Sequence, residues 1–391
     1  MTALSTPAFT APTVASRLPN VGTTIFTVMS ALAQQHDAVN LGQGFPDFEC
    51  DPALLDAVNH AMRSGQNQYP PMAGVPVLRD AVAEKIEALY GRRYDPATEI
   101  TITAGATQAI LTIILAIVHA GDEVIVLDPC YDSYEPNIEL AGGVAVHVPL
   151  TPGSFAPDFT RIAAAITPRT RAIIVNTPHN PSATVWSAAQ MAQLTELLRG
   201  TNIIVIADEV YEHMVFDGQA HQSAARSPEL AARSFVVSSF GKTYHVTGWK
   251  VGYVAAPAAL MTEFRKVHQF NVFTVNTPMQ HGLASFMRNA SHHTGLPAFY
   301  QRKRDLFAAG LAGTRLRALQ TQGSYFQCVD YSAVSDLPEE AFCRWLTQEV
   351  GVAAIPLSAF YQGGFEQHIV RFCFAKKDQT LALALARLAG I

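Results

Sequence analysis

Four short, continuous apolar runs constrain the fold of this 391-residue chain more than any other feature of its sequence. Runs of this length without polar alternation are typical of parallel strands that are buried on both faces of a sheet. Helical stretches separate the runs, so the pattern is a strand followed by a helix, repeated. The sequence therefore predicts an α/β fold with a mostly parallel sheet between layers of helices. The runs span residues 124–127, 172–175, 203–207 and 235–237.

A cluster of polar and aromatic residues follows each run. In a parallel sheet these clusters emerge at one edge, where ligands of open α/β sheets bind. The last cluster contains Lys242, with Ser239 before it and Lys250 after it. A lysine amine attacks an aldehyde well only if burial or a neighbouring cation lowers its pKa, and Lys250 could be that cation. Taken alone, this window is equally typical of a solvated loop. The clusters span residues 128–131, 176–181, 208–211 and 238–242.

Length and composition favour two lobes and a partner subunit. A chain of 391 residues exceeds the size of roughly 250–300 residues at which a single core stops growing. Charged residues make up 15% of the chain, below the roughly 25% usual for soluble domains, which indicates surface covered by another subunit. The net charge of -5 and the absence of basic clusters argue against a nucleic-acid partner.

The cysteines and the apolar segments indicate a cytoplasmic protein without a membrane span. The chain has 5 cysteines, an odd number, and they never occur in the C-x-x-C spacing, so we expect neither disulfides nor a metal site. The longest apolar run, 110–118, is far shorter than the roughly 20 residues that a membrane helix needs. The first 36 residues contain one charged side chain, Arg17, and lack a secretory h-region. We therefore interpret them as an N-terminal arm of the folded protein and not as a signal peptide.

Two further segments are able to approach a ligand with their backbone. Gly42 and Gly44 bracket a turn in which the chain can come close to another group. The small residues at 104–107 precede an apolar helix, and free N–H groups at a helix start are suited to an anion. A plain loop and an ordinary helix start remain the alternatives at these two places. No G-x-G-x-x-G motif follows a strand, so dinucleotide binding has no support.

Taken together, the motifs resemble those of class I/II aminotransferases of pyridoxal-phosphate fold type I, closest to the methionine and kynurenine aminotransferase branch. The resemblance extends over the whole chain and rests on 176–181, 207–211, 239–242 with Lys250, and Arg371-Phe372. It implies a large cofactor-binding domain at 47–290 with the mostly parallel sheet. A smaller α+β domain is then built from both chain ends, with the arm and part of this domain at 1–46 and the rest at 291–391.

The resemblance also implies the roles of the residues around the cofactor, pyridoxal 5'-phosphate. Lys242 matches the lysine that holds the cofactor aldehyde as a Schiff base and later moves a proton at the substrate Cα. Asp208 matches the carboxylate that keeps the ring nitrogen protonated, so that the ring can take up electrons. Tyr211 and Asn180 match donors to the phenolic oxygen, and Tyr131 matches the ring that stacks on the pyridine.

A second set of matching positions surrounds the cofactor phosphate. Tyr69 matches a tyrosine that reaches the phosphate of the neighbouring subunit, so a homodimer with shared sites is implied. Two positions depart from the common pattern: Gln108 stands where glutamate is common, and Lys250 stands where many relatives carry arginine. An arginine can bind the phosphate through two N–H groups at once, whereas the Lys250 amine offers a single point charge. The residues matching the phosphate site are Gly105, Ala106, Thr107, Ser239 and Lys250.

The substrate side of the resemblance predicts an aminotransferase for apolar, sulfur-containing or aromatic amino acids. Arg371 matches the clamp for the substrate α-carboxylate, with Gly44 and Asn180 beside it and Phe45 in the pocket wall. No lysine or arginine lies between Lys266 and Arg288, and the segment 268–273 is aromatic instead, so a side-chain carboxylate would lack a partner. We therefore expect methionine, phenylalanine, tyrosine or kynurenine as donors to a 2-oxo acid.

Two alternatives remain open at this point. A cysteine-S-conjugate β-lyase would use the same scaffold and the same residues, and the sequence separates it poorly from an aminotransferase. A cofactor-binding regulator is the more distant alternative, because no basic helix-turn-helix precedes residue 40.

Overall fold

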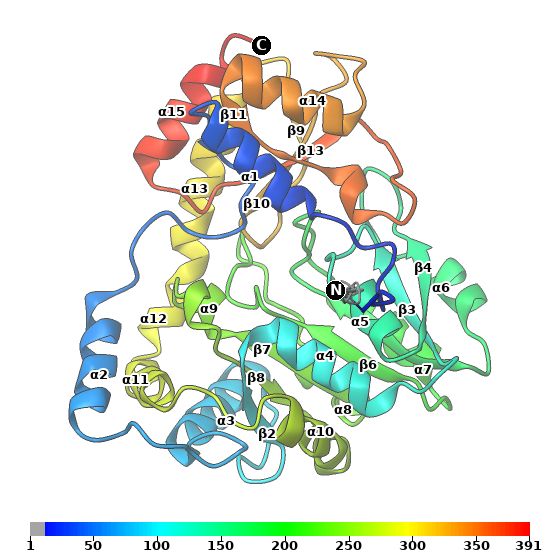
Figure 1. The fold of residues 1–391 in the computed structure, drawn as a ribbon, viewed down its shortest axis with the longest axis vertical. Coiled ribbons are helices and arrows are strands. Elements are labelled where there is room, and N and C mark those ends of the chain that lie inside the picture. The colour runs from blue at the N-terminus through cyan, green and yellow to red at the C-terminus, as the bar shows by residue number, and fades with distance from the viewer. Residues whose placement is uncertain (1–11) are drawn as a thin grey trace, which may run out of the picture.

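A computed structural model describes residues 12–391, and a seven-stranded sheet forms the centre of its large lobe (Figure 1). Only β8 runs against the other strands, since it pairs antiparallel with both of its neighbours. The four apolar runs form β3, β5, β6 and β7, so the predicted α/β fold is confirmed. In spatial order the strands are β2 (Ile100–Thr103), β8 (Gly252–Ala255), β7 (Ser234–Ser239), β6 (Ile204–Asp208), β5 (Thr170–Asn176), β3 (Glu123–Asp128) and β4 (Val144–Pro149).

Helices cover both faces of this sheet, which explains why its strands lack polar alternation. Successive side chains of a strand point to opposite faces. Accordingly, Val124 and Val126 belong to one buried cluster, whereas Ile125 and Leu127 belong to another. The first cluster includes α4 (Gly105–Ile117), α5 (Tyr134–Leu140) and α10 (Ala258–Asn271), and the second includes α6 (Phe159–Ala165), α7 (Ala188–Leu198) and α8 (Pro228–Ala231).

A third cluster packs against the β2 edge of the sheet. The Asp51 side chain caps the first helix of this cluster by accepting a bond from the Ala53 N–H at 2.8 Å. A Cβ on Gly282 would lie 2.3 Å from a Val58 side-chain carbon, so glycine lets two of these helices approach closely. The helices are α2 (Pro52–Arg63), α3 (Pro76–Tyr90) and α11 (Thr277–Met287), and the short α12 (Ser291–Thr294) follows them.

The small lobe joins the two ends of the chain around an antiparallel sheet. β1 (Val39–Asn40) pairs in parallel with β11 (Val352–Ala353), which confirms a second lobe built from both chain ends. The limits predicted at residues 46 and 290 stay predictions. The sheet contains β12 (Ile355–Pro356), β13 (Ile369–Cys373), β10 (Phe326–Asp330) and β9 (Arg317–Ala318), and the helices are α1 (Ile25–Gln35), α13 (Leu296–Leu311), α14 (Glu339–Trp345), η3 (Leu346–Val350), η4 (Leu357–Phe360) and α15 (Asp378–Leu388).

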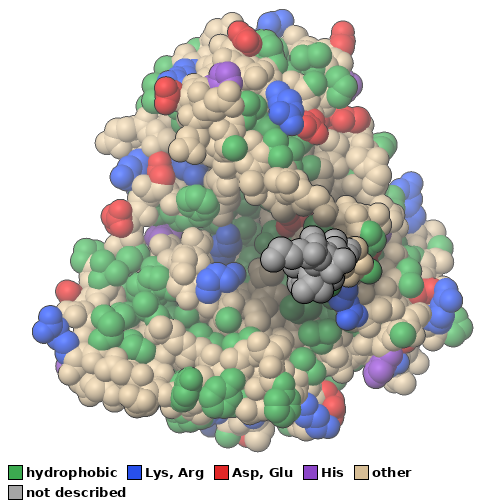
Figure 2. All heavy atoms as spheres, viewed as in Figure 1, with side chains coloured by type: hydrophobic (Ala, Val, Ile, Leu, Met, Phe, Trp, Pro, Cys, Tyr) green, Lys and Arg blue, Asp and Glu red, His purple; other side chains and the backbone are tan. Residues whose placement is uncertain are grey.

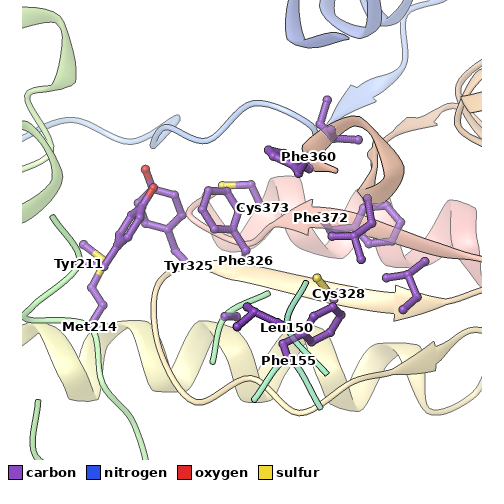
Figure 3. Packing of buried hydrophobic residues seen from close by; sticks show 14 of the residues in the cluster. Leu150, Phe155, Tyr211, Met214, Tyr325, Phe326, Cys328, Phe360, Phe372 and Cys373 are labelled. Carbon is purple, nitrogen blue, oxygen red and sulfur yellow. The ribbon is translucent and has the colours of Figure 1, made fainter. Parts of the chain in front are cut away.

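One continuous buried cluster joins the two lobes. Tyr211 and Met214 of the large lobe lie near Tyr325 and Phe326 of the small lobe (Figure 3). Burial of such large side chains stabilises an interface by roughly 1.5–3 kcal/mol each, so the lobes are held together firmly. Within residues 12–391, no helix combines the length and the apolar character that crossing a membrane requires. All five cysteines are free.

Candidate functional site

A cavity of about 340 Å³ lies between the two lobes, at the carboxyl ends of the central strands. Figure 2 shows that this face of the molecule is hollowed between the small lobe and the large lobe. Every predicted site residue except Tyr69 lines the cavity. These residues are Gly44, Phe45, Gly105, Ala106, Thr107, Tyr131, Asn180, Asp208, Tyr211, Ser239, Lys242, Lys250 and Arg371.

Lys242 lies in the short helix α9 (Phe240–Thr243), which begins directly after β7. Its Nζ donates to the Tyr325 hydroxyl at 2.7 Å and to the Gly44 carbonyl oxygen at 3.1 Å. Burial lowers the pKa of this amine to about 8, and the nearby cations Arg371 and Lys250 act in the same direction. The amine is therefore neutral far more often at neutral pH than an ordinary lysine, as a nucleophile requires.

Asp208 ends β6 and is 4% exposed. The Tyr134 hydroxyl donates to its Oδ2 at 2.5 Å, and the Val210 N–H donates to its Oδ1 at 3.3 Å. Burial raises the pKa of the carboxyl to about 6, although the bond from Tyr134 acts against this rise. A cation held against Asp208 would favour its carboxylate form, so the position is suited to a protonated ring nitrogen.

Arg371 enters the cavity from β13 of the small lobe and is 1% exposed. Its Nη1 donates to Asn180 Oδ1 at 2.6 Å and its Nη2 donates to the Gly42 carbonyl at 3.1 Å, whereas its Nε has no partner within residues 12–391. The guanidinium lies 3.9 Å from the centre of the Phe326 ring. A buried donor without a partner is costly, so this arginine is poised to bind a carboxylate.

The opposite end of the cavity is suited to an anion. Helix α4 begins at Gly105 and has 13 residues, so its first N–H groups and its dipole both favour a negative charge. Lys250 adopts a left-handed backbone with φ 54°, and its Nζ lies 3.4 Å from the place where a Cβ on Gly105 would stand. The amine thus lies next to the helix start, with Ser239 and Thr107 also lining this part of the cavity.

Two tyrosines complete the walls. Tyr211 is buried, which raises the pKa of its hydroxyl and keeps it a proton donor. The Tyr131 ring meets the Tyr134 ring edge to face, with centroids 5.8 Å apart, so its orientation is fixed by packing. These positions agree with the predicted contacts to a planar ring, although the roles themselves stay predictions.

Tyr69 and the aromatic segment 268–273 do not line the cavity of their own chain. Tyr69 is 81% exposed, and its ring packs against Phe273 with centroids 5.3 Å apart. Phe270 is 89% exposed. An exposed patch of large apolar side chains of this kind is typical of a protein interface.

The structure adds site residues that the sequence reasoning missed. Tyr134 holds Asp208, Tyr325 holds Lys242, and Phe26 lines the cavity from α1. Asp132 also lines the cavity, and no ion pair or hydrogen bond from another side chain engages it within residues 12–391. Asp132 and Tyr134 belong to the polar stretch after β3, which was the available signal; nothing in the local sequence marks Tyr325.

Comparisons with known proteins agree with this geometry. Residues 36–388 match the profile of the family described as "Aminotransferase class I and II". The chain is 53% identical to the methionine aminotransferase of Escherichia coli K12 over 95% of this chain and 97% of that protein. It is 36% identical to human kynurenine–oxoglutarate transaminase 1 over 94% of this chain and 95% of that protein. An E. coli crystal structure identified with a methionine aminotransferase function superposes with a TM-score of 0.96 at 52% identity, covering 97% of this chain and 100% of the other.

Proposed function

This chain belongs to the class I and II aminotransferases, and its fold is pyridoxal-phosphate fold type I. We propose that it uses pyridoxal 5'-phosphate to transfer the amino group of methionine, or of phenylalanine, tyrosine or kynurenine, to a 2-oxo acid. The observation that carries the proposal is Arg371, whose Nε has no hydrogen-bond partner among residues 12–391 in a cavity walled by aromatic rings. The similarity to a methionine aminotransferase and a kynurenine transaminase supports the same donors.

The donor set fits the cofactor. Lys242 supplies an amine, Asp208 a carboxylate, and the start of α4 with Lys250 an anion site. When bound, the cofactor supplies an aldehyde that accepts the amino group and a ring that takes up electron density from the substrate Cα. Asp208 would face the ring nitrogen, Tyr211 and Asn180 the phenolic oxygen, and Lys250 with Ser239, Gly105, Ala106 and Thr107 the phosphate.

The chain's own residues then perform three tasks. Lys242 attaches the aldehyde through Nζ and, when released by the substrate, moves a proton at the substrate Cα; its lowered pKa of about 8 favours the neutral form that accepts a proton. Arg371 binds the α-carboxylate, which orients the Cα bond that breaks. Tyr131 and Phe326 exclude water from the side of the cavity where they lie.

The substrate side chain meets apolar walls and one negative charge. Phe26 and Phe45 line the cavity with Gly44, whose N–H finds no acceptor within residues 12–391 and is free to contact a substrate carboxylate. Asp132 lies at the same cavity and forms no ion pair within the described part of the chain, residues 12–391. A second carboxylate on the substrate would therefore be repelled by Asp132 and would find no further arginine, because Arg371 is the only one that lines the cavity among residues 12–391.

A substrate panel tests the proposal. Purified enzyme is given methionine, phenylalanine, kynurenine or aspartate with one 2-oxo acid, and keto acid formation gives kcat/KM. We expect aspartate to be at least about tenfold poorer than methionine, because each missing pairing contact is worth on the order of 1–3 kcal/mol. Aspartate equal to or better than methionine would contradict the proposal. A cysteine S-conjugate in the same panel measures β-elimination separately.

The proposal includes a homodimer with shared sites in the cytoplasm. Tyr69 and Phe273, which pack together, and Phe270 are exposed aromatic residues that a second copy would cover, and Tyr69 would then reach the partner's phosphate site. A reducing compartment suits the five free cysteines. Sedimentation of the purified protein tests the assembly, and a fully active monomer would rule out shared sites.

A further inference from the structure

A tyrosine of the small lobe contacts the amine of Lys242. Tyr325 lies directly before β10, is 0% exposed, and accepts a hydrogen bond from Lys242 Nζ at 2.7 Å. Its own hydroxyl donates to the Gly44 carbonyl oxygen, which also accepts from Nζ at 3.1 Å. The Lys242 amine, the Tyr325 hydroxyl and the Gly44 carbonyl oxygen therefore meet at one point, although they come from α9, from the residue before β10 and from the loop after β1.

Packing fixes where the Tyr325 hydroxyl lies. The ring meets those of Tyr211 and Phe326 at centroid distances of 5.0 and 4.9 Å, and Tyr300 packs at 5.9 Å. Figure 3 shows the hydroxyl ends of Tyr211 and Tyr325 close together, pointing away from the strands of the small lobe. A side chain locked in this way holds its partner with little freedom.

The direction of the hydrogen bonds follows from the groups involved. The Gly44 carbonyl oxygen can only accept, so Tyr325 donates its single proton there; its two lone pairs are then available to the Lys242 N–H and to the neighbouring Tyr211 hydroxyl. A neutral lysine amine has two N–H groups and one lone pair. The two contacts engage both N–H groups, and the lone pair is left free in the remaining direction.

We propose that Tyr325 is a positioning residue that orients the free amine of Lys242 so that its lone pair can take the proton from the substrate Cα. The inference rests on the proposed function for the reaction that the lysine serves, and on geometry alone for the contact itself. A hydroxyl that donated to Nζ would occupy the lone pair, and Gly44 prevents this.

A matched control is available in the neighbouring Tyr300. It is equally buried, and its hydroxyl has no hydrogen-bond partner within residues 12–391. Tyr325→Phe and Tyr300→Phe thus remove the same atom from adjacent rings, but only the first removes a bond to Lys242. Melting temperatures of both variants check that the fold is kept.

The first measurement is the reaction of the holoenzyme with methionine. For Tyr325→Phe we expect kcat to fall roughly tenfold, the effect of one lost hydrogen bond to a reacting group, while KM stays within about twofold. Tyr300→Phe should behave like the wild type. An unchanged kcat in Tyr325→Phe, or an equal loss in Tyr300→Phe, would overturn the proposal.

The second measurement does not depend on activity. Full-length protein stripped of cofactor is labelled with trace acetic anhydride across a pH series, and mass spectrometry of the Lys242 peptide gives the pKa of that amine. An acceptor favours the charged form, so Tyr325→Phe should titrate below the wild-type pKa of about 8, and Tyr300→Phe should not. A lower kcat with an unchanged pKa would mean that Tyr325 acts through packing and would overturn the proposal. If no amino acid reacts with the wild type, the proposed function fails, but the labelling still decides whether Tyr325 holds Lys242.

Discussion

Two buried clusters of this protein each contain a lysine and a carboxylate, but they differ in how far their polar groups are already bonded to one another. In the cavity, burial shifts the pKa values of Lys242 and Asp208 toward their uncharged forms. The Nε of Arg371 has no hydrogen-bond partner within residues 12–391. In the second cluster, which does not line the cavity, Glu212 accepts from the Lys85 Nζ at 2.6 Å and from three hydroxyl groups. These belong to Tyr90, Ser238 and Tyr253.

The difference shows what separates a structural charge from a functional one. Burial alone would raise the pKa of Glu212, but Lys85 and the hydrogen bonds lower it well below its usual value. At Asp208 burial prevails and raises the pKa to about 6. The Glu212 cluster joins α3 to the residues next to Tyr211 and Ser239, so it supports the site without taking part in it.

The largest effect should follow removal of the Lys242 amine. Lys242→Ala should lower turnover by at least roughly 10⁴-fold, because both attachment and proton transfer are lost, while the fold is kept. Steady-state kinetics measures the loss, and Lys266→Ala is the control, since that exposed lysine pairs only with Glu263. Borohydride reduction of the wild-type holoenzyme should label the Lys242 peptide; a label elsewhere would show that the site is wrong.

Breaking the Glu212 cluster should lower the stability of the fold rather than act on the chemistry directly. Glu212→Gln should reduce the free energy of unfolding by about 3–5 kcal/mol, because Lys85 is left charged and buried without its partner. The pKa of Glu212 is lowered on folding, so its contribution is present above its unfolded value of 4.5 and disappears as pH falls through the folded value. Denaturant unfolding across pH should therefore show a weaker acid dependence in the variant. Glu263→Gln on the surface is the control, and an equally stable Glu212→Gln would contradict this account.

Asp208→Asn should lower activity but raise stability, and these opposite effects distinguish the cavity most clearly from the Glu212 cluster. Turnover should fall roughly 10²–10³-fold, since an amide cannot act as the counter-charge of a protonated ring nitrogen. The pKa of Asp208 is raised on folding, so its charge destabilises the cofactor-free protein as pH rises above 3.8 through about 6. The variant without cofactor should hence be more stable at pH 7, on the order of 1–3 kcal/mol. Near wild-type turnover would end the assigned role.

The smallest effect concerns Asp132, which lines the cavity. Asp132→Asn should raise kcat/KM for aspartate by about threefold, a modest change because Asp132 is exposed to solvent. The value for methionine should change less, since its side chain is uncharged. Competition between the two donors in one reaction gives the ratio directly, and the increase should shrink at high salt. A ratio that does not move would remove Asp132 from the account of specificity.

Local patterns, and the resemblance of several motifs to those of a known family, determined much of this protein from the sequence alone. The apolar runs predicted β3, β5, β6 and β7, because strands buried on both faces must be apolar throughout. The start of α2 is also a local feature, because the Asp51 side chain caps an N–H group that is close to it in the chain. The motifs around Lys242, Asp208 and Arg371 predicted residues that the fold does bring into one cavity.

Only the tertiary structure decided which bonds these residues make. The reversed direction of β8 depends on its pairing with β7 and β2, which are far from each other in the sequence. Tyr325 is 83 residues from Lys242, and Tyr134 is 74 residues from Asp208, so no local pattern could reveal either contact. The Arg371 Nε, which has no partner among the residues that the structure describes, and the shifted pKa values of Lys242 and Asp208 depend on burial and on neighbours from other elements. Periodicity reports which way a side chain points along its own strand or helix, whereas desolvation and hydrogen bonding depend on everything that packs around it.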